Sequence, residues 1–172
     1  MDNSQLRRLF AGIRNGSETD FETLYEDMKT PVFTVIYRML GSIPDAEDVT
    51  QEVFVKLFCD PPAENVKNIR AWIFTVAHNM AVDRIRVFNK TAVSDAVEDF
   101  RDNSDDFLLP MEIENAMRQL SDEEREIVAM HINAGLKHRE IAEILKIPLG
   151  TVLWKYRKAL DKLKNYLTEE PT

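Results

Sequence analysis

The chain has 172 residues, enough for one medium-sized domain or two small ones. Apolar residues make up 44% and charged residues 30%, as in ordinary globular proteins, and only 5 glycines and 7 prolines argue against an all-β architecture. The net charge of −8 argues against a simple nucleic-acid binder, because phosphate attracts basic proteins.

The sequence carries no signal for export. No apolar run is long enough to span a bilayer. The opening segment MDNSQLRRLF lacks the apolar core and cleavage site of a signal peptide. The single cysteine, Cys59, excludes an internal disulfide and fits a reducing compartment. We therefore expect a cytoplasmic protein.

Apolar residues recur at helical spacing nearly throughout, which predicts an all-α protein. Two apolar stripes come first, and Gly41 ends the second. A third helix follows Pro44, and a fourth runs from about Asn68 to Phe88. The first stripe contains Phe21, Leu24, Tyr25 and Met28, and the second contains Val32, Val35, Ile36, Met39 and Leu40.

Residues 89–110 interrupt this helical pattern. They carry 2 basic and 6 acidic side chains, which is half of the net charge of the chain. An acidic segment without sustained periodicity is typical of a flexible linker. We therefore expect two small helical domains, residues 1–88 and 111–172, joined by an acidic tether.

The second domain contains a helix-turn-helix pattern. Ser121 and Glu124 have the spacing of a capping box, and Gly135 can end the helix that they begin. A short helix, a tight turn and a second helix follow, and in such motifs the second helix enters the major groove. The expected apolar positions are Ile127, Val128 and Ile132, then Ile141, Ala142 and Leu145, then Ile147 in the turn, and finally Val152, Tyr156, Ala159, Leu160 and Leu163.

The exposed face of that second helix combines cations, a hydroxyl and an indole. Arg157 and Lys158 can contact phosphate or guanine, and Thr151 can contact phosphate or a thymine methyl. The alternative is a solvated basic face on which Trp154 packs against a neighbouring domain. Lys146 occupies a turn position that often holds glycine, which costs about 1 kcal/mol if the residue is left-handed.

Two segments of the first domain, YRMLGSIPDAEDVTQEVFVKLF (37–58) and NIRAWIFTVAHNMAVDRIR (68–86), resemble region 2 of extracytoplasmic-function (ECF) sigma factors. The segment from Ile113 to Leu160 resembles region 4 of the same family, except that Leu153 and Trp154 stand where relatives commonly have Lys-Ser. The resemblance covers nearly all of the chain outside the tether. It implies an initiation subunit without a catalytic site, cofactor or metal of its own.

The resemblance also assigns roles to residues. The expected docking site for the β′ clamp helices of core RNA polymerase consists of Asp45, Asp48, Gln51, Glu52 and Val55. In the family the helix from Asn68 and the loop before it, here about residues 59–67, open the minus-ten element and capture an extruded base, and Asn79 matches the family asparagine at that pocket. Trp72 could stack on a base, although a core anchor is at least as good an explanation of it. The full set expected at the minus-ten element is Arg70, Trp72, Thr75, Asn79, Arg84 and Arg86. From the exposed face of the helix-turn-helix, rather than from the resemblance, we expect contacts with the minus-thirty-five element by Arg139, Thr151, Trp154, Lys155, Arg157 and Lys158.

Further partners follow from the same resemblance: the β flap, promoter DNA and an anti-sigma factor that wedges between the two domains. The tether would thread the polymerase cleft and mimic nucleic acid through Asp95, Glu98, Asp99, Asp102, Asp105 and Asp106, although a merely solvated linker is an equal alternative. Two other functions remain open: a stand-alone helix-turn-helix regulator, and a protein-interaction adaptor without DNA contact.

Overall fold

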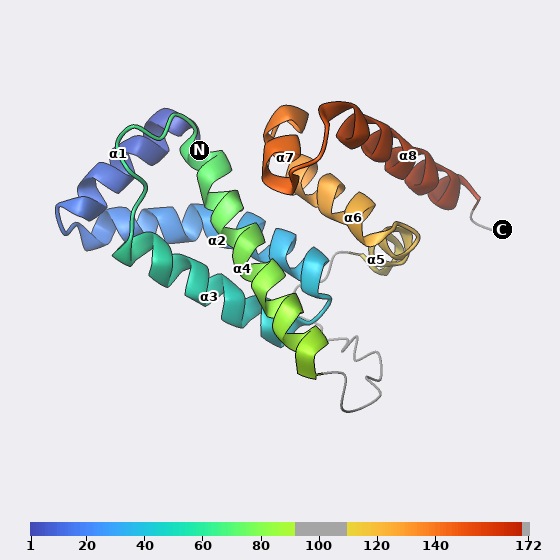
Figure 1. Cartoon of the computed structure of the whole chain (residues 1–172), viewed down its shortest axis with the longest axis horizontal. Coiled ribbons are helices and arrows are strands. Elements are labelled where there is room, and N and C mark those ends of the chain that lie inside the picture. Colours follow the sequence, from blue (N-terminus) through green and yellow to red (C-terminus); the bar gives the residue numbers. More distant parts are fainter. Residues whose placement is uncertain (92–109, 170–172) are drawn as a thin grey trace. The chain divides into compact units, whose positions relative to one another are not determined.

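The computed structural model describes residues 1–91 and 110–169, and every regular element within them is a helix, as the sequence predicted. The chain divides into two compact units, Met1–Phe100 and Arg101–Thr172 (Figure 1). Most of the predicted tether, with its six acidic residues, lies outside the described residues, and residues 89–91 continue a helix of the first unit. None of the helices described is long and apolar enough to cross a membrane.

The first unit is built around one long central helix. Its helices are α1 (Asn3–Arg14), α2 (Glu18–Leu40), α3 (Ile43–Cys59) and α4 (Ile69–Thr91). α2 contacts each of the other three, and α3 also packs on α4. Both apolar stripes of the sequence lie on α2, which continues through Pro31 and ends at Gly41 with a left-handed φ of 70°.

α3 confirms the predicted core stripe and shows why the helix begins where it does. Ser42 is the N-cap, Pro44 lies in the first turn, and the Ser42 hydroxyl accepts a hydrogen bond of 3.4 Å from the Asp45 amide. The stripe residues Ala46, Val49, Val53 and Leu57 are all fully buried. This burial turns the opposite side of α3 to solvent.

Helix α1 was not among the helices predicted from the sequence. Asp2 caps this helix in a capping box with Gln5. Its buried residues, Leu6, Phe10 and Ile13, are spaced four and three apart. That spacing was the available signal, although it covers only two turns of a helix rich in polar residues.

The second unit confirms the predicted helix-turn-helix. Its helices are α5 (Met111–Arg118), α6 (Asp122–Val128), the π-helical turn η2 (Ala129–Asn133), α7 (His138–Leu145) and α8 (Leu149–Thr168). Ser121 and Glu124 form the predicted capping box, Gly135 has a left-handed φ of 68°, and Lys146 adopts a left-handed φ of 56° between α7 and α8.

Two predicted core positions of this unit are wrong. Ile132 is 58% exposed, because the wider π turn places the buried Ala129 and Ala134 five residues apart and leaves Ile132 outside them. Leu160 is 39% exposed, because the buried stripe of α8 runs through Val152 and Ala159. Leu160 lies about 100° around the helix from Ala159.

Candidate functional site

The first candidate surface is the solvent-facing side of α3. Asp48, Gln51, Glu52 and Val55 are all exposed there, and Val55 is 61% exposed. Carboxylates beside an apolar side chain suit a partner that carries both basic and apolar groups. Four of the five predicted polymerase-docking residues are therefore accessible on this side, and Asp45 in the first turn is half-buried.

Arg84 of α4 is held against this acidic face. Its Nη2 lies 2.9 Å from a carboxylate oxygen of Glu52, and its Nη1 lies 3.6 Å from one of Asp45. The sequence assigned Arg84 to minus-ten DNA, whereas the structure brings it together with two predicted docking residues. The Glu52 side chain is 54% exposed, so the pair contributes at most about 1 kcal/mol of stability.

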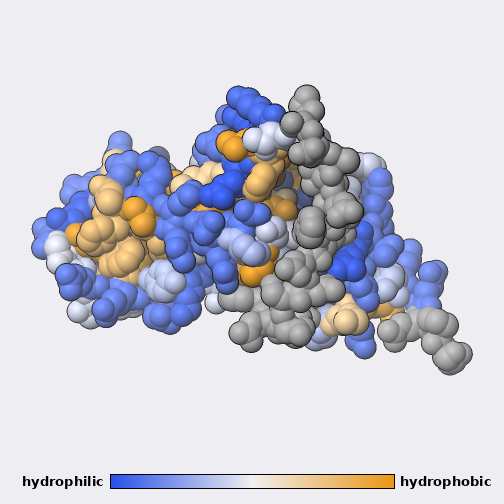
Figure 2. All heavy atoms as spheres, turned by 90° about the horizontal axis from the view of Figure 1, so that it is seen from below, coloured by the Kyte–Doolittle hydropathy of each residue, from blue (hydrophilic) through white to orange (hydrophobic). Residues whose placement is uncertain are grey.

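An aromatic cluster that the sequence analysis missed adjoins the acidic face. Phe21 and Phe58 meet edge to face with ring centroids 5.0 Å apart, and Tyr25 and Phe54 do the same at 4.8 Å. Phe58 is 47% exposed and Tyr25 is 36% exposed. Apolar side chains gather at this end of the unit, where α2 begins and α3 ends (Figure 2). Only the packing of α2 on α3 unites residues so far apart in sequence.

α4 carries the predicted minus-ten residues, and the structure distinguishes their settings. Asn79 is exposed, and its side-chain amide makes no hydrogen bond to the described part of the chain. Trp72 is half-buried with its ring edge-on to Phe10, at a centroid distance of 6.3 Å. The Thr75 hydroxyl donates to the Ala71 carbonyl at 2.8 Å. Of Trp72, Thr75 and Asn79, only Asn79 therefore offers an exposed polar side chain that a base edge could meet.

The arginines of α4 also differ in their surroundings. Arg86 is well exposed, and its Nη1 lies 3.5 Å from Asp83. Arg70 instead turns toward the N-terminus, where it donates to the Met1 carbonyl at 3.2 Å and its guanidinium lies over the Phe74 ring. Arg86 is accordingly better placed than Arg70 to meet a DNA phosphate.

The second candidate surface is the exposed face of α8 in the helix-turn-helix. Trp154 is 60% exposed, and the Lys158 ammonium lies 4.8 Å from the centroid of its indole ring. Arg157 is exposed on this helix, and Arg139 is exposed on α7. Thr151 is half-buried in the first turn of α8. Cations and an indole thus share the accessible side of the second helix of the motif.

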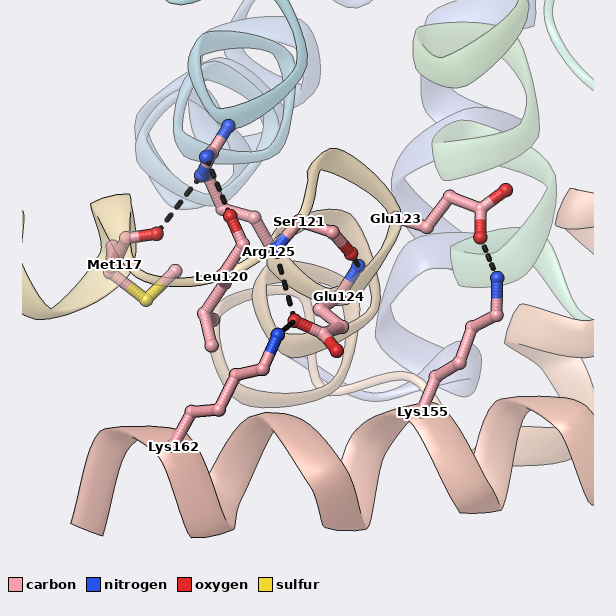
Figure 3. Close-up of polar contacts among 8 residues, drawn as sticks. All are labelled: Met117, Leu120, Ser121, Glu123, Glu124, Arg125, Lys155 and Lys162. Atoms are coloured by element: carbon pink, nitrogen blue, oxygen red, sulfur yellow. Dashed lines mark hydrogen bonds and ion pairs between the residues drawn. The ribbon is translucent and has the colours of Figure 1, made fainter. Parts of the chain in front are cut away.

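Two other lysines of α8 are used to hold the helix. Lys155 forms an ion pair with Glu123 of α6, and the Lys162 ammonium lies 2.7 Å from Glu124 (Figure 3). The sequence grouped Lys155 with the DNA contacts, but its ammonium faces α6. Of the predicted α8 cations, Arg157 and Lys158 remain on the open face.

Glu124 is a buried carboxylate with two donors. It is 3% exposed and accepts hydrogen bonds from Lys162 and, at 2.9 Å, from the Ser121 amide. Burial acts to raise the pKa of Glu124, but these hydrogen bonds and the positive charge of Lys162 outweigh it, so its pKa lies below the ordinary value. Glu124 therefore caps α6 and anchors α8 at once.

A cluster of aromatic rings joins the first helix of the motif to the second. His131 and His138 stack with ring centroids 4.2 Å apart, and each also meets the ring of Tyr156 on α8. Nε2 of His138 is buried without a hydrogen-bond partner. Burial and the neighbouring His131 both lower the pKa of His138, which favours its neutral form.

Within residues 1–91 and 110–169, no three His, Cys, Asp or Glu side chains are grouped as a metal site requires. The accessible functional groups lie instead on three faces. The α3 face is acidic and partly apolar, the α8 face is basic and aromatic, and α4 presents the exposed side chain of Asn79.

Comparison with known proteins identifies both units. Residues 24–90 match the model of sigma-70 region 2, and residues 116–165 match that of sigma-70 region 4. The chain is 24% identical to the ECF RNA polymerase sigma factor SigW of Bacillus subtilis, over 95% of this chain and 97% of SigW. It is 25% identical to the ECF RNA polymerase sigma factor SigK of Mycobacterium tuberculosis, over 95% and 94% of the two chains.

Solved structures share the fold. The sigma factor RpoE of Bartonella quintana, solved with the anti-sigma factor NepR, aligns with a TM-score of 0.71 at 19% identity, over 88% of this chain and 99% of RpoE. CnrH, solved with the cytosolic domain of CnrY, aligns with a TM-score of 0.66 at 20% identity, over 96% and 98% of the two chains.

The two matched regions together cover more than half of the chain, and the relatives align along nearly its whole length. Region 2 corresponds to the unit with the acidic α3 face, and region 4 corresponds to the unit with the helix-turn-helix. The chain therefore belongs to the sigma-70 family, as an ECF-type RNA polymerase sigma factor that directs transcription initiation and is not an enzyme.

Proposed function

We propose that the three exposed faces divide the work of initiation. The α3 face docks on the β′ clamp helices of core polymerase, α4 and the loop before it open and capture the minus-ten element, and α8 reads the minus-thirty-five element, with region 4 also contacting the β flap. The supporting observation is the segregation of chemistry: exposed carboxylates on α3, the open amide of Asn79 on α4, and Arg157 and Lys158 on α8.

The accessible state of these residues supports the assignment. Asn79 can both donate to and accept from the edge of an extruded base, which has lost its pairing partner. Arg157 and Lys158 can reach phosphates or guanine from a helix lying in the major groove. The carboxylates of α3 are repelled by DNA and attracted by a basic protein surface. Each face thus suits one partner better than the other two.

Purified core polymerase and run-off transcription from genomic promoters test the proposal. The double variant Arg157→Ala/Lys158→Ala should lose at least about ten-fold in affinity for minus-thirty-five duplex, since each good base contact is worth about 1–3 kcal/mol. Lys164→Ala, an exposed lysine farther along α8, is its control. Full promoter activity of the double variant would contradict the role of α8.

The other two faces have their own variants. Asp48→Asn should weaken binding to core while leaving DNA contacts intact, and Glu22→Gln, an exposed carboxylate on α2, is its control. Asn79→Ala should bind core normally and fail to open the minus-ten element, measured by the reactivity of unpaired thymines to permanganate. Failure of the wild-type chain to bind core would overturn the whole assignment.

We also propose domain limits, a compartment and a regulator. Residues 1–88 act as region 2, residues 89–110 as an acidic linker and residues 111–172 as region 4, and the factor works in the cytoplasm beside the polymerase. An anti-sigma factor holds it inactive, which is supported by the similar folds solved with NepR and CnrY. Tagged factor recovered from its own cells should carry a protein that blocks core binding, and factor that binds core fully under all growth conditions would refute this regulation.

A further inference from the structure

The loop between α3 and α4, residues 60–68, has no regular structure of its own. Its one internal backbone hydrogen bond runs from the Val66 amide to the Ala63 carbonyl, at 3.0 Å. Most carbonyls of such a loop have no partner in a helix or strand, so its shape depends on donors from elsewhere. The structure supplies those donors from α1.

Arg7 of α1 holds the second half of the loop. Its Nη1 donates to the Glu64 carbonyl at 3.0 Å, and its Nη2 donates to the Val66 carbonyl at 3.0 Å and more weakly to that of Lys67 at 3.5 Å. The guanidinium is planar and presents its donors in a fixed fork, so one side chain sets the relative positions of several carbonyls.

Arg14, two turns farther along α1, holds the start of the loop. Its Nη2 donates to the carbonyl of Pro62, whose own side chain is buried. Asn3, one turn before Arg7, reaches the far end of the loop: its Oδ1 accepts from the Arg70 amide, and its Nδ2 donates to Asn68, each at 3.1 Å. α1 therefore contacts the loop at its beginning, middle and end.

The chemistry of these contacts points to positioning. Arg7 and Arg14 are exposed side chains bonded to backbone carbonyls, which any residue in the loop would present. The contacts of Arg7 and Arg14 consequently fix the path of the backbone without engaging a side chain of the loop. The guanidinium of Arg8, also exposed on α1, makes no hydrogen bond or ion pair to the described residues. Arg7 and Arg14 thus differ from Arg8 in the backbone carbonyls that they contact, although all three residues are arginines.

We propose that Arg7 and Arg14 are positioning residues for base capture: they hold the backbone of residues 60–68 in the shape that receives a base extruded from the minus-ten strand. This rests on the proposed role of the loop and α4 in capturing that base. A loop ordered in advance loses less conformational entropy when it binds, so it binds tighter and discriminates better between bases. Neither arginine needs to touch the DNA.

The test uses the full chain assembled with core polymerase. Its probe is a single-stranded non-template oligonucleotide spanning the minus-ten element of a promoter mapped by run-off transcription, together with versions carrying each other base at the captured position. Arg7→Gln and Arg14→Gln should bind the cognate oligonucleotide at least ten-fold more weakly and lose most of the preference for the cognate base. Arg7→Lys, which lacks the fork, should restore little of that preference.

The controls separate positioning from general stability. Arg8→Gln should behave as the wild type. Core affinity, binding of minus-thirty-five duplex and the thermal unfolding midpoint should be unchanged in all variants. A purely structural role would instead change these three quantities and leave the ratio of affinities for the cognate and other bases unchanged. An unchanged base preference in Arg7→Gln and Arg14→Gln, or a loss that only parallels unfolding or core affinity, overturns the proposal.

The same assay distinguishes the two levels of inference. If the wild-type holoenzyme shows no base preference on the oligonucleotide, or Asn79→Ala keeps the full preference, the proposed capture site is wrong and the positioning role falls with it. If the wild type discriminates, Asn79→Ala does not, and the arginine variants discriminate as well as the wild type, then only the positioning role is wrong.

Discussion

The two units hold their proposed DNA-reading elements with different chemistry. In the first unit, arginines of α1 donate to backbone carbonyls of the loop before α4. In region 4, Lys155 and Lys162 of α8 pair with Glu123 and Glu124 of α6. A carbonyl cannot titrate, whereas a carboxylate can, so the anchor of α8 should respond to pH, whereas the contacts of α1 with the loop should not. Similar cations thus yield a fixed support in one unit and a titratable one in the other.

The largest expected effect is the loss of the anchor of α8. Glu124→Ala removes a buried carboxylate that serves both Ser121 and Lys162, so we expect region 4 to lose about 1–3 kcal/mol of unfolding free energy. Urea unfolding of the full chain, followed by NMR amide signals from each unit, measures it. The control Glu123→Ala removes a carboxylate whose side chain is 65% exposed and should cost no more than about 1 kcal/mol. Equal effects of the two variants would show that burial does not matter here.

The next prediction concerns pH. The pKa of His138 is lowered in the fold, so the unfolded chain binds its proton more readily. The stability that His138 contributes is present above its ordinary pKa of about 6.5 and is lost as the pH falls through its folded value. Glu124, whose pKa is also lowered, adds a further loss of stability at more acidic pH. As the pH is lowered from 7.5 to 5.5, the urea midpoint reported by the region 4 signals should therefore fall, while the midpoint reported by the region 2 signals should change less.

His138→Phe tests the cause of that pH dependence. Phenylalanine keeps a ring against His131 and Tyr156 and removes the buried nitrogen that lacks a partner. The variant should flatten the dependence near pH 6 without affecting the more acidic loss that Glu124 causes. An unaltered pH profile would assign the effect to another group.

A smaller effect of opposite sign is expected in the turn of the helix-turn-helix. Lys146 has a φ of 56°, while Gly41 serves the corresponding left-handed position at the end of α2. Lys146→Gly should stabilise region 4 by up to about 1 kcal/mol, because glycine adopts this conformation without strain. Lys164→Gly, inside right-handed α8, should instead destabilise by a similar amount, about 1 kcal/mol. Thermal unfolding of both variants decides whether backbone strain is present at Lys146.

The smallest effect is expected for the ion pair of region 2. Arg84→Gln breaks contacts with Glu52 and Asp45 that remain partly open to water, so its unfolding free energy should change by less than about 1 kcal/mol. Arg86→Gln, on the more exposed side of α4, provides the matched comparison. A loss as large as that of Glu124→Ala would mean that region 2 also depends strongly on a titratable pair.

Much of the fold could be predicted from local patterns. The buried stripe of α3, the Ser121 capping box and the helix-turn-helix follow from periodicity and cap chemistry, and all are present. The exposure of Ile132 could not be predicted, because a π turn carries no simple sequence signature and changes the spacing of inward positions. Helix α1 was missed because two turns of apolar spacing in a polar segment are a weak signal.

In the candidate sites, too, some features could be predicted from the sequence and others could not. Exposure of Asp48, Asn79 and Arg157 follows from their place on a helix whose other side is buried. The ion-pair partners of Lys155 and Arg84 could not be predicted in this way. Helical periodicity gives the direction of a side chain, but it does not identify the side chain that lies opposite it.

The sequence by itself therefore determined the all-helical class, the pairing of region 2 with region 4 and the faces proposed to meet polymerase and DNA. The class and the faces depend on periodicity and residue type along one segment, and the pairing depends on the resemblance of two segments to one family. Only the tertiary structure decided which cations are available, since Lys155 pairs with Glu123 and Arg70 turns toward Met1. It also decided that α1 supports the loop before α4, because hydrogen bonds between segments more than 45 residues apart leave no trace in local spacing.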